Sequence, residues 1–100
     1  MEFAKLTIRA ALEGLRKRTL SAVELAQAVV GAVEACNSTL GAYLWFDREA
    51  VLKEAAAADE ARAAGSDLPL LGIPLALKDN ICVAGEPCGC ASRMLEGVIA

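Results

Sequence analysis

The feature that most constrains the fold is an uninterrupted apolar run that ends in a lysine. The run extends from Leu71 to Leu77, and Lys78 follows it directly. Because its apolar residues do not alternate with polar ones, the pattern predicts a strand covered on both faces, as in a largely parallel sheet. Pro74 fits only the first residues of such a strand. The sequence therefore predicts an α/β fold with a buried strand at about 72–78.

Lys78 would then stand at the carboxyl end of this strand, where open α/β sheets form their ligand crevices. A lysine that is desolvated at such a place loses its proton readily and is a candidate base. The alternative is a lysine that simply leaves the strand into solvent, followed by an Asp-Asn turn. Spacing alone leaves both interpretations open, and Lys78 is a candidate site residue on the first of them.

Upstream of this strand, the sequence predicts three helices and one short strand. A capping residue marks the start of each helix: Thr7, Ser21 (with Glu24 as the partner of a capping box) and Asp47. The expected helices span about 7–18, 21–36 and 47–64. The aromatic-rich run at about 42–46 predicts a short strand whose rings pack against the core.

Charge and hydropathy exclude several classes of function. The formal net charge of −3 and the pI near 4.9 argue against a nucleic-acid-binding surface, which needs clustered basic residues. No apolar stretch approaches the roughly 20 residues of a membrane-spanning helix. The amino terminus has no secretory pattern. We therefore expect no membrane partner and a location in the cytoplasm, or in an organelle matrix if a targeting segment has been lost.

The four cysteines, Cys36, Cys82, Cys88 and Cys90, are expected to be free, buried thiols. Their spacing lacks the paired Cys-x2-Cys of zinc sites, and the chain contains no histidine. The sequence therefore predicts neither a metal site nor a cysteine nucleophile.

Two motifs follow one another between Leu71 and Gly97. The first is Gly72-Ile73-Pro74, Ala76 and Lys78-Asp79-Asn80, and after Gly85 the second is Ala91-Ser92-Arg93-Met94-Leu95-Glu96. Together they resemble the amidase signature family and, within it, the A subunits of glutamyl-tRNA(Gln)/aspartyl-tRNA(Asn) amidotransferases. The resemblance covers essentially the whole chain, as the amino-terminal portion of a longer enzyme. Cys88-Gly89 departs from the family pattern, in which a Thr-Thr pair is usual.

The resemblance implies a Ser–cis-Ser–Lys triad in which Lys78 matches the family lysine. That lysine acts as general base through the bridging serine and later as general acid, so it must be neutral when it accepts the proton. The two serines belong to a Gly/Ser-rich block that this chain does not contain. The chain alone is therefore expected to be catalytically inactive.

The resemblance also implies an α/β/α sandwich with a mixed central sheet, of which residues 1–100 would be the amino-terminal part. The implied function is release of ammonia from glutamine, which a B subunit uses to amidate misacylated Glu-tRNA(Gln) or Asp-tRNA(Asn). Partners would be the B and C subunits, with tRNA reached through B. The complete complex would use ATP and Mg, and no cofactor is expected in this segment.

Two alternatives remain open at this stage. The first is a stand-alone amidase of the same family, and the second is a non-catalytic helical interaction fragment. On its own, the chain is expected to aggregate, because its apolar strand has no sheet neighbours here.

Overall fold

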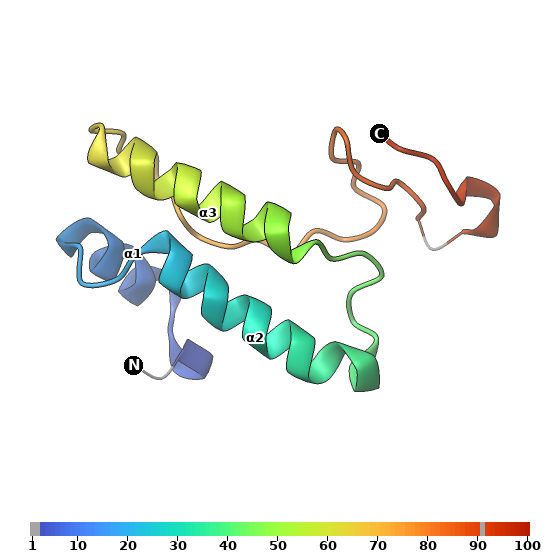
Figure 1. The fold of residues 1–100 in the computed structure, drawn as a ribbon, viewed down its shortest axis with the longest axis horizontal. Helices are drawn as coiled ribbons and strands as arrows, with labels where there is room; N and C mark the ends of the chain where they lie inside the picture. Colours follow the sequence, from blue (N-terminus) through green and yellow to red (C-terminus); the bar gives the residue numbers. More distant parts are fainter. Residues whose placement is uncertain (1–2, 91) are drawn as a thin grey trace.

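The structure, a computed structural model, describes residues 3–90 and 92–100. Over these residues the chain forms three α-helices, α1 (Ile8–Lys17), α2 (Ala22–Leu40) and α3 (Arg48–Ala63), and two short 3-10 helices, η1 (Phe3–Lys5) and η2 (Arg93–Leu95). α2 and α3 lie side by side and run in opposite directions, and α1 packs at the start of α2 (Figure 1). Among the described residues, no helix is long and apolar enough to cross a membrane.

Each helix begins where its capping residue predicts. The Thr7 hydroxyl accepts a hydrogen bond from the Ala10 N–H at 3.1 Å. Ser21 forms the complete capping box, because its hydroxyl accepts from the Glu24 N–H at 3.0 Å and the Glu24 carboxylate accepts from the Ser21 N–H at 3.2 Å. Asp47 accepts from the Ala50 N–H at 3.2 Å. These predicted caps are confirmed.

The predicted end of α2, near position 36, is four residues too early, because the helix continues to Leu40. Neither Cys36 nor Asn37 breaks a helix, so the helix stops only where the backbone turns left-handed. That residue is Gly41, with a φ of 62° and an N–H that donates to the Asn37 carbonyl at 2.7 Å. Glycine adopts this conformation without a steric penalty and is therefore the common terminator of helices.

The core lies where α1, α2 and the second half of α3 meet. Its largest fully buried side chain is that of Leu15, only 1% exposed, on the inner face of α1. The buried cluster consists of Ala11, Leu15, Leu20, Ala22 and Leu25, with Phe3, Leu6, Ala55, Ala58 and Ile73 packed against it. The small residues of α3 allow it to approach α2 closely, so this face of the alanine-rich helix is used for packing.

A carboxylate from α3 completes the start of α2. Asp59 accepts the Ala22 N–H at 2.8 Å and the Val23 N–H at 3.1 Å, one on each oxygen. Together with Ser21, it satisfies the first backbone donors of α2, which have no partner inside the helix. A negative charge at this end also complements the helix dipole. Asp59 is 37 positions from Ala22 and 36 from Val23 in the sequence, so this contact fixes α3 against α2.

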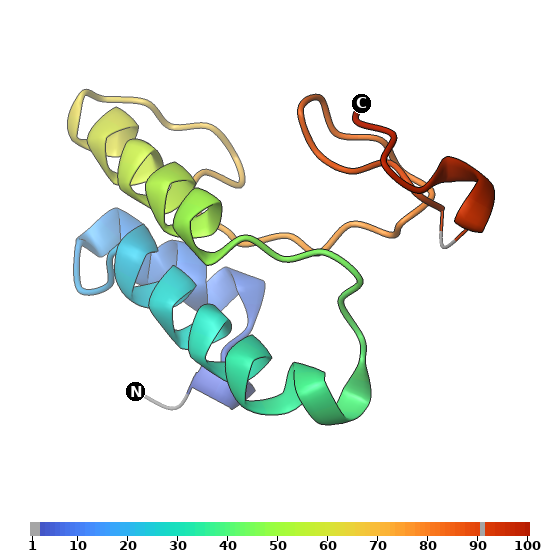
Figure 2. The ribbon, with the colours of Figure 1, turned by 45° about the vertical axis from the view of Figure 1, so that its right-hand side comes forward.

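Neither predicted strand forms. Within residues 3–90 and 92–100, the segments 42–46 and 72–78 have no β-ladder, and the pairing is limited to an isolated antiparallel bridge between Pro87 and Ile99. After the core contact of Ile73 the chain leaves the helices (Figure 2). Leu75 is 80% exposed and Leu77 48%. The physical reason is that a strand exists through hydrogen bonds to a neighbouring strand, and no described segment supplies one.

Candidate functional site

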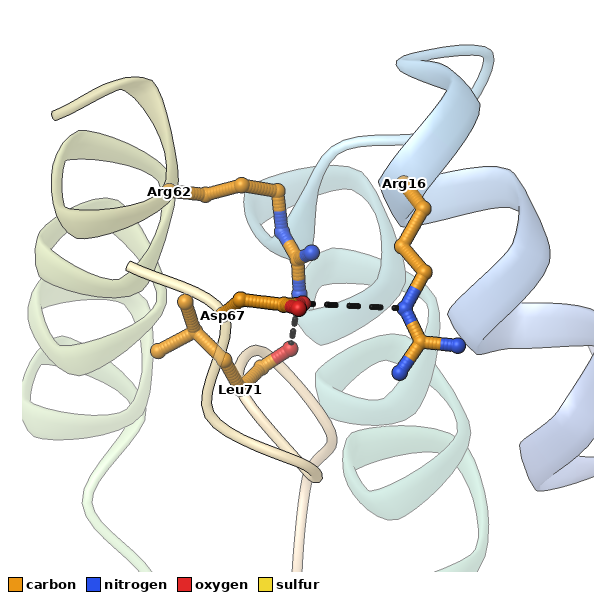
Figure 3. Close-up of polar contacts among 4 residues, drawn as sticks. All are labelled: Arg16, Arg62, Asp67 and Leu71. Carbon is orange, nitrogen blue, oxygen red and sulfur yellow. Dashed lines mark hydrogen bonds and ion pairs between the residues drawn. The ribbon is translucent and has the colours of Figure 1, made fainter. Parts of the chain in front are cut away.

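The segment that leads to Lys78 is anchored to the helical core just before it becomes exposed. The Arg62 guanidinium of α3 donates a hydrogen bond to the Leu71 carbonyl at 2.6 Å. Arg16 of α1 reaches toward Asp67 of the same loop at 3.9 Å, in an exposed ion pair (Figure 3). Arg62 is half-buried, so its contact is the stronger of the two, whereas exposed pairs contribute little.

Gly72 of the first motif is required by the geometry of this anchor. Its φ is +88°, and a Cβ there would lie 3.2 Å from the Ala22 Cβ and 3.3 Å from Leu15 Cδ1. The backbone therefore passes directly over the buried start of α2 in a conformation that L-residues avoid. Ile73 follows and packs on the same cluster. The glycine thus fixes the point from which residues 74–78 depart.

Lys78 lies exposed, in a turn rather than at the end of a strand. Its carbonyl accepts a hydrogen bond from the Ile81 N–H at 2.9 Å, which closes the turn through Asp79 and Asn80. Lys78 is not buried as a lysine at the end of a strand would be, because no sheet within the described residues covers this segment. The position of Lys78 in this structure matches the alternative of a lysine that leaves into solvent.

Lys78 lines an open hollow of about 470 Å³ formed by three separate segments. One segment follows α2, one contains Lys78, and one belongs to the loop after it. The hollow is lined by Ala42, Tyr43, Leu44, Trp45, Ala76, Leu77, Lys78, Asp79, Ile81, Val83, Glu86 and Pro87. Its lining combines the exposed amine of Lys78 with apolar and aromatic side chains and with the carboxylates of Asp79 and Glu86.

The aromatic side of the hollow is fixed by Asn37, which sequence reasoning missed. Its side chain contacts the backbone of Tyr43 twice: Nδ2 donates to the Tyr43 carbonyl at 3.1 Å, and Oδ1 accepts from the Tyr43 N–H at 2.8 Å. The prediction that these aromatics pack in the core was wrong, since Tyr43 is 37% exposed and Trp45 42%. Tyr43 makes a tilted contact with Phe46 instead, with ring centroids 6.2 Å apart. No spacing rule in the sequence points to Asn37.

The third segment is a loop closed by a disulfide. Cys82 and Cys88 are bonded, whereas Cys36 and Cys90 are free and exposed. The expectation of four free, buried thiols was therefore wrong for the pair and wrong in burial for the other two. The even number of cysteines was the signal for pairing, and it was outweighed by the missing secretory pattern.

The remaining candidate chemistry is limited. Within residues 3–90 and 92–100, no cluster of three or more His, Cys, Asp or Glu residues is arranged to hold a metal ion. Ser92 caps η2, its hydroxyl accepting from the Met94 N–H at 3.3 Å, and Ser21 caps α2. The second motif begins with Ala91, which lies outside the described residues. What the hollow offers is one amine and neighbouring carboxylates, without a serine–base pair among its lining residues.

Comparison with known proteins identifies the family. A sequence model described as Amidase matches residues 24–100, which include the hollow and both motifs. The chain belongs to the amidase family. The match covers nearly all of α2, together with α3 and the segment of Lys78, so these two helices and the hollow are parts of an amidase domain. No solved structure matches the chain significantly.

Curated relatives narrow the comparison. The chain is 47% identical over 96 residues to the A subunit of the glutamyl-tRNA(Gln) amidotransferase of Desulfosudis oleivorans, covering 96% of this chain and 20% of that protein. Proteins of the same name from Akkermansia muciniphila and Neisseria meningitidis serogroup C are 48% and 42% identical, covering 86% and 94% of this chain and 17% and 20% of theirs. The chain therefore spans about a fifth of the length of these relatives.

Proposed function

We propose that this amidase-family chain is the amino-terminal part of the A subunit of a tRNA-dependent amidotransferase. The observation that carries the proposal is the 47% identity to a protein of that name over 96% of the chain. The two motifs of residues 72–80 and 91–96 support it, because they resemble those of the same subunits in order and spacing. The proposed activity is release of ammonia from glutamine and its use in transamidation of Glu-tRNA(Gln) or Asp-tRNA(Asn).

Lys78 is the proposed catalytic residue of this chain. In the proposed triad it takes the proton of the serine nucleophile through a second serine and later returns it to the leaving ammonia. Both serines would lie in sequence outside these residues. A lysine acts as a base only when neutral, and desolvation favours the neutral form. Because Lys78 is exposed here, the rest of the amidase domain must cover it in the active enzyme.

The proposed assembly has B and C subunits, with tRNA bound chiefly by B. The acidic balance of this segment, a net charge of −3, is in keeping with indirect tRNA contact. ATP and Mg would serve the transamidation step in the complete complex, and no residue of this segment is assigned to them. The complete domain would be an α/β/α sandwich in which residues 72–78 gain the strand partners they lack here. The proposed location is the cytoplasm.

The test uses the complete protein with its partner subunits and two variants of Lys78. Lys78→Ala should abolish glutamine hydrolysis while the complex still assembles. Lys78→Arg should be nearly as inactive, because a guanidinium remains protonated and cannot serve as a base. Supplying ammonia directly should restore tRNA amidation in both variants, since only ammonia release requires the triad.

Two outcomes would contradict the proposal in different ways. Near-normal glutaminase activity in Lys78→Arg would remove Lys78 from the mechanism. Glutamine or simple amide hydrolysis at full rate without the B partner, and no amidation of tRNA with it, would instead support a stand-alone amidase. Lys53, an exposed lysine of α3, is the matched control, because Lys53→Ala removes the same charge away from the hollow.

A further inference from the structure

The loop after Lys78 is closed on itself by the bond between Cys82 and Cys88, six residues apart with Cα atoms 5.6 Å from one another. Cys82 immediately follows Ile81, whose N–H closes the Lys78 turn at 2.9 Å. The disulfide therefore ties the far end of the loop to the residue next to that turn. Three residues of the closed loop, Val83, Glu86 and Pro87, line the hollow beside Lys78.

The same loop supports the last described residues of the chain. The Gly85 N–H donates to the Ala100 carbonyl at 2.6 Å, the Ala100 N–H to the Glu86 carbonyl at 3.0 Å, and the Cys88 N–H to the Val98 carbonyl at 2.9 Å. These bonds surround the bridge between Pro87 and Ile99. Since they all involve residues at or inside the disulfide loop, opening the loop loosens the pairing with 98–100 as well.

The two bonded cysteines are placed where a soluble thiol can reach them. Cys82 is exposed and Cys88 half-buried, and Cys90, a free and exposed thiol, stands two residues beyond Cys88. Exposed disulfides exchange with thiols readily, whereas buried structural disulfides do not. In a reducing compartment, disulfides that form at all are mostly transient or redox-sensing.

We propose that Cys82 and Cys88 form a reversible redox site, whose oxidised state holds the loop against the Lys78 hollow and whose reduced state releases it. The reductant is a small dithiol. Its thiolate attacks Sγ of Cys82, the S–S bond breaks, and Sγ of Cys88 leaves with the electron pair and takes a proton from water. The second thiolate of the dithiol then attacks the mixed disulfide and frees Cys82, which is protonated in turn. Two electrons pass to the protein, and the dithiol ends as its cyclic disulfide.

This redox site is independent of the function proposed above, and its test does not use catalytic activity. The complete protein is purified without reductant, alkylated with iodoacetamide and digested for mass spectrometry, with and without prior dithiothreitol. Cys82 and Cys88 should be linked and unmodified before reduction and alkylated after it. Cys36, a free and exposed thiol on α2, should be alkylated in both samples and is the internal control.

Hydrogen exchange then measures the structural consequence. Reduction should speed exchange of the Gly85, Cys88 and Ala100 amides by roughly tenfold, while α1–α3 stay unchanged. In Cys82→Ser, the same three amides should exchange at the fast rate both with and without reductant. Cys90→Ser should retain the linkage and the response, as should Cys36→Ser.

Each contrary result overturns the proposal. Alkylation of Cys82 and Cys88 in the unreduced protein as fast as that of Cys36 means that no disulfide forms. A Cys82–Cys90 linkage means that the proposed pair is wrong. Equal exchange of the loop amides in both states means that the bond does not hold the loop.

Discussion

The carboxylate of Asp59 is the clearest single point at which tertiary structure stabilises a helix of this protein. It accepts the first two backbone N–H groups of α2, from Ala22 and Val23, at 2.8 and 3.1 Å. Replacing Asp59 by alanine leaves both donors without this acceptor. Ala22 is only 1% exposed, so water cannot reach its N–H without local opening.

The size of the effect follows from these contacts. Hydrogen bonds to a charged group contribute about 1.5–3 kcal/mol each, and loss of a helix cap costs about 0.5–2 kcal/mol. The two bonds share one carboxylate and are not additive, and alanine recovers up to about 0.7 kcal/mol of helix propensity in α3. We therefore expect Asp59→Ala to destabilise the start of α2 by about 2 kcal/mol, a factor of about 30 in local opening.

The assay is native-state hydrogen exchange of the α2 amides in the complete protein. Asp59→Ala should raise exchange at Val23 and through the first turn about 30-fold, and Asp59→Asn should give an intermediate increase, because one acceptor remains but the charge is lost. Glu60→Ala is the matched control, because Glu60 is exposed and adjacent to Asp59 in the sequence. The Ala22 and Val23 amides bond to Asp59 and not to Glu60. Glu60→Ala should therefore change the stability of the start of α2 by no more than about 0.5 kcal/mol. If Asp59→Ala and Glu60→Ala behave alike, the tertiary cap contributes nothing and the reasoning is refuted.

Gly72→Ala should destabilise the anchor of the Lys78 segment by about 2–3 kcal/mol, because the positive φ costs alanine about 1–2 kcal/mol and its Cβ meets Ala22 and Leu15 at 3.2 and 3.3 Å. Gly31 lies in the middle of α2 with open space around it, so Gly31→Ala should instead stabilise α2 by up to about 1 kcal/mol. Thermal unfolding of both variants checks that the two changes have opposite signs. Equal shifts of the unfolding midpoint would contradict the argument. The isolated 100-residue chain should self-associate, because Leu75 and Leu77 are exposed on a segment that pairs with no strand in the described part of the chain. A monodisperse monomer in sedimentation, with slow exchange across residues 71–78, would disprove this expectation.

Local signals in the sequence specify the helices well. Thr7, Ser21 and Asp47 each cap the helix that follows them, because a short polar side chain satisfies backbone donors only a few residues away. The same locality explains the error at the end of α2: the helix continues through Cys36 because nothing next to it stops a helix, and it ends at Gly41. The motif residues around Lys78 also pointed to the amidase family without reference to the fold.

The contacts that fix the helices and the candidate site could not be predicted from the sequence, because each joins residues that no periodicity relates. Asp59 reaches the start of α2, Asn37 holds Tyr43, and Arg62 holds Leu71, each through a geometry that exists only after the helices have formed and packed. The prediction of a strand at 72–78 was wrong because a strand also depends on distant residues. An apolar pattern records that a segment is suited to burial in a sheet, but the ladder itself requires a neighbouring strand.

The sequence by itself determined the helix starts and the family, since these depend on side chains acting on their own neighbourhood or on motifs read in order, and it singled out Lys78 as a candidate. Only the tertiary structure decided that Lys78 lies exposed beside a hollow, that Cys82 pairs with Cys88, and that Gly72 passes over Leu15 and Ala22. These outcomes depend on which distant segments come within a few ångströms of one another. Chain packing sets those distances, and no local preference encodes them.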